Sequence, residues 1–161
     1  MKATVYLGLG ANLGEPLAQL NKAITLISSQ EHIEFISSSS FYKSKAWGVT
    51  DQPDFINCAV ETTCNINPFE LLSLLKRLEI ELGRVPSDRW GPRHIDIDIL
   101  YFSHLTLSTP ELTLPHKSLH ERTFALAPLA ELAPHLQLPQ GSLTDLIQKL
   151  DDDNVQPLIP T

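Results

Sequence analysis

Residues 67–102 read NPFELLSLLKRLEIELGRVPSDRWGPRHIDIDILYF, a helix pattern followed by a polar turn and a strand pattern. At the start of the helix pattern, Asn67 is a cap, Pro68 takes the first helical position and Glu70 completes a capping box. The apolar face of this helix carries Leu71, Leu75, Leu78 and Leu82. The alternation of IDIDILYF then predicts a strand over residues 95–102.

The rest of the chain shows the same helical and strand periodicities. Strands are predicted over residues 3–9, 33–42 and 54–64. Helices are predicted from Pro16 to about Ser29, over residues 123–132 with an interruption near Pro128, and after a cap at Ser142. The order β-α-β-β-α-β followed by helices is the split βαβ pattern of a ferredoxin-like sheet. We therefore expect one α+β domain over residues 1–161, with additional C-terminal helices.

The composition limits the classes of function. The chain of 161 residues is 42% hydrophobic and 19% charged, as expected for a globular protein. Its net charge of -7 argues against a general nucleic-acid binder or a protein of anionic membranes. No apolar run approaches the length of a membrane span or a signal sequence. Cys58 and Cys64 lie in one predicted strand and cannot easily bridge, so we expect reduced thiols and a cytoplasmic protein.

Positive charge is concentrated in the middle of the chain. All five arginines fall within residues 77–122, together with His94, His116 and Lys117. The planar guanidinium of arginine suits phosphate oxygens, so this grouping indicates a local anion site. A scatter of surface salt bridges is the alternative interpretation.

Two aspartates alternate with isoleucines at the start of the last predicted strand. Because side chains alternate between the faces of a strand, Asp96 and Asp98 project to one side while the isoleucines project into the core. The Cα atoms of the two aspartates would lie about 7 Å apart, which lets both carboxylates reach one or two hard cations. Magnesium prefers a few carboxylates together with water and substrate phosphates. The alternative is that this pair only forms the solvated face of an amphipathic strand.

Arginines directly precede the aspartate pair. The turn RWGPR at residues 89–93 brings two guanidiniums beside the carboxylates, and Arg84 lies just after the preceding helix. Carboxylate-bound metal and arginines around a polyphosphate are recurring parts of phosphoryl-transfer sites. Together these features favour a catalytic role for Asp96 and Asp98.

At this point the chain resembles the hydroxymethyldihydropterin pyrophosphokinases, a family of folate-pathway enzymes. The most specific motif is RWGPRHIDIDIL at residues 89–100. Further matches, in the family's order, are GANLG at 10–14, SSFY at 39–42, DQPDFIN at 51–57, Glu79 with LGR at 82–84, and Pro115-His116 with Arg122 and Phe124. The resemblance covers nearly the whole chain. Departures from the family pattern stand at Ala46, Pro86 and Lys117.

The resemblance implies a reaction and the ions that support it. Such enzymes transfer the β,γ-diphosphate of ATP to the hydroxymethyl oxygen of 6-hydroxymethyl-7,8-dihydropterin and release AMP. By this likeness Asp96 and Asp98 would hold two Mg²⁺ ions, while Arg84 and Arg93 would stabilise charge during the transfer. Mobile loops around Trp47 and over residues 84–90 would close on the active site. We expect a monomer with no obligate protein partner, no nucleic acid and no membrane.

The implied substrate contacts form two sets. The nucleotide set comprises Glu79, Arg84, Arg89, Trp90, Arg93, Ile99, Leu112, Thr113, His116 and Arg122. The pterin set comprises Ser44, Lys45, Trp47, Phe55, Asn57, Asp96 and Phe124. Phe55 and Phe124 would hold the flat heterocycle between two aromatic faces. Glu79 has an alternative interpretation, as a structural carboxylate that pairs with Arg84 or Arg93.

Other interpretations use the same residues. GLGANLG at residues 8–14 superficially suggests a dinucleotide loop, but its glycine spacing does not fit G-x-G-x-x-G. We take it as a strand-to-helix turn in which Asn12 braces an active-site loop. His116 and His120 would need a third ligand to bind zinc. A magnesium-dependent nucleotidyl or glycosyl transferase is a second candidate, and a ferredoxin-like RNA reader, with aromatic residues and lysines on its sheet face, is a third.

Overall fold

The computed structural model describes residues 2–45, 53–83, 95–152 and 154–158. The strands of the main sheet are β1 (Ala3–Ala11), β2 (Ile33–Ser38), β3 (Tyr42–Ser44), β4 (Phe55–Cys64), β5 (Asp96–Phe102) and β10 (Gln156–Pro157). The helices are α1 (Pro16–Ser28), α2 (Pro68–Glu81), α3 (Thr123–Leu132), α4 (Leu143–Leu150) and the 3-10 turn η1 (Leu119–Glu121). Two small hairpins pair β6 (Leu107–Ser108) with β7 (Thr113–Leu114) and β8 (Gln137–Leu138) with β9 (Gly141–Ser142).

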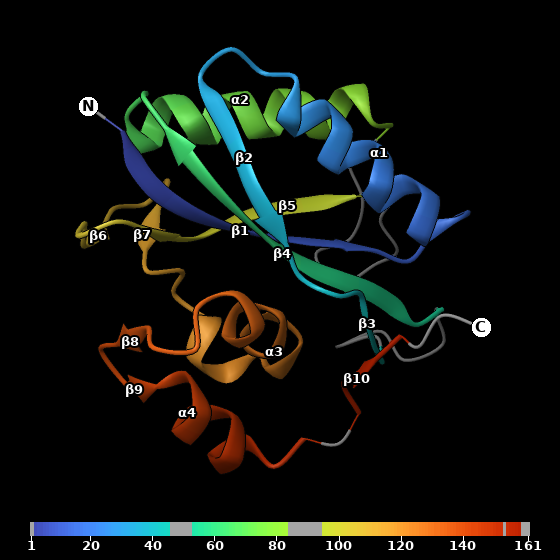
Figure 1. Ribbon diagram of the computed structural model, residues 1–161, viewed down its shortest axis with the longest axis vertical. Coiled ribbons are helices and arrows are strands. Elements are labelled where there is room, and N and C mark those ends of the chain that lie inside the picture. Colours follow the sequence, from blue (N-terminus) through green and yellow to red (C-terminus); the bar gives the residue numbers. More distant parts are fainter. Residues whose placement is uncertain (1, 46–52, 84–94, 153, 159–161) are drawn as a thin grey trace.

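The sheet separates two layers of helices (Figure 1). Helices α1 and α2 cover one face, and α3 with α4 lies on the other. Strand β4 pairs with β1 on one side and with β2 and β3 on the other, and β1 also pairs with β5. All strand pairs among the described residues are antiparallel. The predicted ferredoxin-like α+β fold is confirmed.

Capping hydrogen bonds are present at the predicted starts of two helices. At α2 the Asn67 side chain accepts from the backbone N–H of Glu70 (2.9 Å), and the Glu70 carboxylate accepts from the backbone N–H of Asn67 (3.3 Å). At α4 the Ser142 hydroxyl accepts from the backbone N–H of Asp145 (3.1 Å). These bonds satisfy donors that have no partner within the helix, so local sequence alone fixes both starts.

The single strand predicted over residues 33–42 is wrong, because β2 ends at Ser38 and a separate strand, β3, begins at Tyr42. Between them, the Ser39 hydroxyl accepts a hydrogen bond from the backbone N–H of Ala59 (2.9 Å). The hydroxyl thereby accepts a donor of the neighbouring strand in place of a backbone carbonyl, through a contact between residues 20 positions apart. The next residue, Ser40, is bonded to α3, because its backbone N–H donates to the Glu131 carboxylate (2.8 Å).

The interruption predicted near Pro128 is also wrong, because α3 continues through this proline to Leu132. A proline inside a helix removes one backbone donor. Leu126 and Leu129, on either side of it, are both 0% exposed and pack in the core beneath the sheet. Their burial offsets the lost hydrogen bond, which the local sequence could not indicate.

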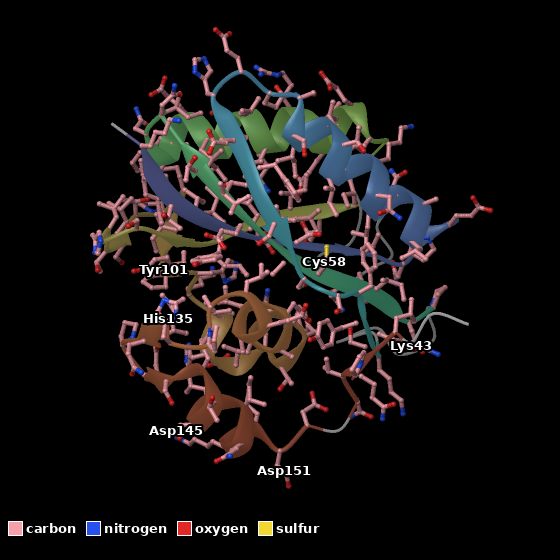
Figure 2. All side chains as sticks on the ribbon, in the orientation of Figure 1. Lys43, Cys58, Tyr101, His135, Asp145 and Asp151 are labelled. Carbon is pink, nitrogen blue, oxygen red and sulfur yellow. The ribbon has the colours of Figure 1, made fainter. Side chains whose placement is uncertain are left out.

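Each face of the sheet has its own apolar core. The core against α1 and α2 includes Ile95, Ile97 and Ile99, as predicted, and the core against α3 and α4 includes Leu100. Cys58 and Cys64 are buried free thiols, and burial raises the pKa of Cys58 to about 12. Figure 2 shows Cys58 inside the molecule and the side chain of Asp151 at its surface. Every helix in the described ranges is too short or too polar to cross a bilayer.

Candidate active site

A pocket opens between the sheet and the start of α3. Its empty volume is about 820 Å³, part of which is open to solvent. Residues predicted for substrate or metal contact converge here from β3, β4, β5 and the segment that leads into α3. They are Ser44, Lys45, Phe55, Asn57, Asp96, Asp98, His116, Arg122 and Phe124.

Two glycines of β1 form the floor of this pocket. In the strand register, Gly10 lies between Asn57 of β4 and Asp96 of β5. Gly8 lies opposite Asp98. Residues that are opposite on neighbouring strands share one face of the sheet. At these two positions β1 contributes no side chain of its own, which lets the Leu100 side chain lie over Gly8 and the Asn57 amide lie over Gly10.

This floor was not predicted, because residues 8–14 were expected to form a turn and β1 instead continues to Ala11. The available signal was two glycines at alternate positions of an apolar strand, which mark one face without side chains. The Asn12 side chain donates a hydrogen bond to the carbonyl oxygen of Pro53 (2.9 Å), so it braces the segment that leads into β4.

Asp96 and Asp98 are both half-buried and both line the pocket, on the face opposite the isoleucine core. Burial and the negative charge of Asp96 raise the pKa of Asp98 to about 7, and the charge of Lys76 partly opposes this. Neighbouring carboxylates repel each other when no cation lies between them. A cation placed between the two carboxylates would therefore be held favourably.

The two carboxylates fit a hard divalent cation. Their oxygen donors, half-buried at the wall of an open pocket, match the preference of Mg²⁺ for a few carboxylates plus water and substrate oxygens. A bound cation would also remove the repulsion that raises the pKa of Asp98. The zinc alternative lacks support, since no cluster of three or more His, Cys, Asp or Glu that could bind metal occurs within the described ranges.

His116 is a neutral hydrogen-bond donor beside this pair. Its backbone N–H donates to the carbonyl oxygen of Leu100 (2.9 Å), which ties this segment to β5. The N–H of Ser118 donates to Nδ1 of the ring (3.2 Å), so the ring proton is on Nε2. Burial, followed by the charge of Arg122, lowers the pKa of His116 to about 4. The imidazole is therefore uncharged at neutral pH.

Aromatic side chains form the apolar end of the pocket. Phe55 begins β4 and Phe124 lies in the first turn of α3, and both are half-buried. The Arg122 guanidinium carbon lies 5.7 Å from the centre of the Phe124 ring, a cation–π distance. Arg122 thus brings a fixed positive charge to the same wall as an aromatic face.

A buried amide of β4 also lines the pocket. Asn57 is 5% exposed, and its Nδ2 donates to the hydroxyl oxygen of Ser44 (2.7 Å). Because the amide has further donor and acceptor positions, it suits a ligand whose polar edge carries both. The sequence predicted both residues but not this bond between them.

Glu79 lies outside the pocket lining. It is 1% exposed, and its carboxylate accepts a hydrogen bond from the backbone N–H of Ile97 (2.7 Å). Lys76 lies 3.6 Å from the other oxygen of this carboxylate. The predicted pairing with Arg84 or Arg93 falls outside the described residues.

The remaining predicted site residues either do not line the pocket or fall outside the described ranges. Ile99 and Leu112 are 3% and 9% exposed and belong to the core against α1 and α2, so their side chains do not line the pocket. Thr113 is half-buried in β7 and is likewise absent from the lining. Predicted residues that lie outside the described ranges are Trp47, Arg84, Arg89, Trp90 and Arg93.

Comparison with known proteins gives consistent matches. A family model described as 7,8-dihydro-6-hydroxymethylpterin-pyrophosphokinase matches residues 6–134. The chain is 39% identical to a 2-amino-4-hydroxy-6-hydroxymethyldihydropteridine pyrophosphokinase of Haemophilus influenzae over 158 residues, which are 98% of this chain and 99% of that protein. It is 42% identical to the Pseudomonas aeruginosa protein of the same name over 137 residues, which are 85% of each chain.

Solved structures show the same fold. A crystal structure of an HPPK-DHPS protein in complex with substrates aligns with 99% of this chain at a TM-score of 0.78 and 12% identity. The Plasmodium falciparum HPPK-DHPS A437G structure aligns with 98% of it at a TM-score of 0.74 and 15% identity. The chain spans about half the length of these two proteins, 47% and 49%.

Proposed function

The chain belongs to the 7,8-dihydro-6-hydroxymethylpterin-pyrophosphokinase family and is a diphosphotransferase, and we propose that it transfers the β,γ-diphosphate of ATP to 6-hydroxymethyl-7,8-dihydropterin. The reaction releases AMP and serves folate biosynthesis. The observation that carries the proposal is the pocket itself, in which a pair of carboxylates adjoins an arginine, a buried amide and two aromatic rings. These groups match the polyphosphate and the flat polar heterocycle that the reaction must bring together.

The pterin would bind at the aromatic end of the pocket. Phe55 and Phe124 would stack on its two faces, with Asn57 and Ser44 bonded to its polar edge. Lys45 and Trp47 would complete this subsite, and Asp96 would lie next to the hydroxymethyl group. The absence of a side chain at Gly10 lets the Asn57 amide lie close to the sheet beside this group.

The ATP polyphosphate would lie on the opposite side of the aspartates. Arg122 and the Nε2 proton of His116 would donate to its oxygens, and Arg84, Arg89, Trp90 and Arg93 would complete the nucleotide site. Because the side chains of Ile99 and Leu112 are buried in the core, these two residues would contact the adenine through their backbone, near Thr113.

Asp96 and Asp98 would hold two Mg²⁺ ions. Such ions neutralise charge on the phosphates and align the attacking and leaving oxygens. The pterin hydroxyl oxygen forms a bond to the β-phosphorus, the bond from that phosphorus to the α-phosphate oxygen breaks, and the hydroxyl proton is released. Arg84, Arg93 and Arg122 would stabilise the charge that shifts onto the phosphate oxygens.

Phosphorus NMR of the protein with Mg-ATP and the pterin tests this function. We expect AMP together with a pterin diphosphate. Release of inorganic pyrophosphate would instead indicate a nucleotidyl transferase, and an unchanged ATP spectrum would indicate a binding protein.

A methyl group at Gly10 is expected to impair pterin binding. A Cβ at this position would lie 2.8 Å from Oδ1 of Asn57, closer than side chains tolerate, so the amide must move. Displacing one hydrogen-bonding group costs about 1–3 kcal/mol, which is about 10–100-fold in affinity. We expect Gly10→Ala to raise the KM for the pterin by that factor and to leave the KM for ATP within about twofold. Steady-state kinetics with each substrate varied in turn would measure both values, and an equal rise in both would contradict the expectation.

Metal binding is expected to weaken in acid. The raised pKa of Asp98, about 7, means that this carboxyl holds a proton below that pH, and a metal must displace it. We expect the apparent affinity for Mn²⁺ or Mg²⁺ to be constant above pH 8 and to fall by up to about tenfold per pH unit below 7. Isothermal titration in buffers of different ionisation enthalpy would detect the released proton. Proton release that is absent at pH 6 would contradict this.

We also propose that the protein acts as a monomer in a reducing compartment, the cytoplasm. Both cysteines are free and buried, as is usual where disulfides do not form. Light scattering of the purified protein would test the assembly state.

A further inference from the structure

Glu79 faces the peptide unit that joins Asp96 to Ile97, the residue between the two aspartates. Its side chain is 2% exposed, yet it does not line the pocket. One oxygen, Oε2, accepts the N–H of Ile97 at 2.7 Å, and Oε1 lies 3.6 Å from Nζ of Lys76. Burial of a carboxylate is costly unless such partners compensate for the lost water. The position of Glu79 therefore has a reason beyond packing.

The N–H of Ile97 needs this partner because of its place in the sheet. Strand β5 pairs with β1 alone in the main sheet of the described ranges, so its other edge faces α2. Ile97 is 1% exposed, and a buried backbone donor at a strand edge requires an acceptor from elsewhere. Glu79 of α2 supplies that acceptor.

The anchored peptide unit lies between the two metal-binding candidates in the sequence and is part of the backbone of one of them. Its carbonyl carbon belongs to Asp96, and Asp98 follows Ile97 directly. If this unit rotated, the two carboxylates would no longer point to the same face of the strand. Supporting hydrogen bonds around metal ligands are typically worth about 10–100-fold in metal affinity or activity.

We propose that Glu79 is a positioning residue, whose carboxylate anchors the Ile97 peptide and so holds Asp96 and Asp98 in the orientation that binds the metal and polyphosphate. This inference rests on the proposed function and replaces direct nucleotide contact as the role of Glu79. Glu79 would thus support the two aspartates from the edge of β5 that faces α2.

Three substitutions at Glu79 separate hydrogen bonding from charge. Glu79→Gln keeps an acceptor without the charge, Glu79→Leu removes the acceptor at similar volume, and Glu79→Asp keeps the charge but is one methylene too short to reach Ile97. Glu81, exposed on the same helix, provides matched controls as Glu81→Gln and Glu81→Leu. The readouts are kcat, the KM for ATP, Mn²⁺ binding by electron paramagnetic resonance, and hydrogen exchange of the Ile97 amide by NMR.

We expect the leucine and aspartate variants to bind Mn²⁺ about 10–100-fold more weakly, to lose kcat by a similar factor and to exchange the Ile97 amide faster. The glutamine variant and both Glu81 variants should stay within about threefold of the wild type. Normal Mn²⁺ binding and kcat in a folded leucine or aspartate variant would overturn the inference. So would a glutamine variant as impaired as the leucine variant while its Ile97 amide stays protected, because the charge would then be what matters.

The inference can still be tested if one variant does not fold or if the wild type is inactive. If Glu79→Leu fails to fold by circular dichroism, Glu79→Asp, which retains the buried charge, still removes the anchor. If the wild type forms no pterin diphosphate, the proposed function fails, whereas Mn²⁺ binding and amide exchange still report whether Glu79 orients the aspartates.

Discussion

Replacing Asp96 or Asp98 with alanine is expected to reduce kcat for AMP formation by about 10³-fold or more. A metal at a transferring phosphoryl group supplies several kcal/mol of charge stabilisation, and about 1.4 kcal/mol corresponds to a factor of ten. Each carboxylate lines the pocket and neither is part of an apolar core, so its removal should not disturb packing. Single-turnover quench experiments at saturating Mg-ATP and pterin would measure the loss.

Asp98→Ala should lose activity without a loss of thermal stability. The raised pKa of Asp98, about 7, compares with about 3.9 in an unfolded chain, so between these values the folded state binds the extra proton. This carboxyl therefore lowers stability as the pH rises through that interval, and at pH 8 its ionised form opposes folding. We expect metal-free Asp98→Ala to unfold at the same temperature as the wild type or above it at pH 8.

Asp145→Ala is the matched control for both measurements. Asp145 is exposed on α4 and does not line the pocket, so its alanine variant should retain wild-type kcat. If Asp98→Ala kept more than a tenth of the wild-type kcat, the carboxylate would not be a metal ligand. If it lost activity only because it unfolded, its role would be structural.

Asn57→Leu is expected to lower kcat/KM for the pterin by about 10²–10³-fold. The amide is 5% exposed and bonded to Ser44, so it can present fixed donor and acceptor positions to a ligand. Sites built to hydrogen-bond a substrate discriminate by up to about 10⁴–10⁵-fold, because an unmatched polar group is left buried. One group among several should account for part of that range. Leucine has a similar volume, which limits the disturbance of packing.

The comparison that isolates this effect is Asn65→Leu at the other end of β4. Asn65 is exposed, its side chain bonds to His32, and it does not line the pocket, so pterin kinetics should be unaffected. In Asn57→Leu, fluorescence titration with an ATP analogue should give an unchanged Kd. Equal losses for ATP and pterin would show that Asn57 supports the pocket generally and does not recognise the heterocycle.

Much of the fold follows from local sequence. The Asn67 capping box, the Ser142 cap and the alternation of residues 95–102 each depend on neighbours within a few positions, and all three occur as predicted. The division of residues 33–42 and the continuity of α3 through Pro128 depend on contacts with distant strands. Local patterns contain no information about such contacts, which explains both errors.

The sequence by itself determined which chemical groups this protein has and which face of β5 they share, because strand alternation places Asp96 and Asp98 together regardless of the rest of the chain. Only the tertiary structure decided what stands around them. Antiparallel pairing put Gly10 between Asn57 and Asp96 and put Gly8 opposite Asp98, and the packing of α2 against the edge of β5 placed Glu79 behind the two carboxylates. The physical reason is that a hydrogen bond between residues 18 positions apart, or a register between strands, is fixed by burial of the whole core and has no local signature.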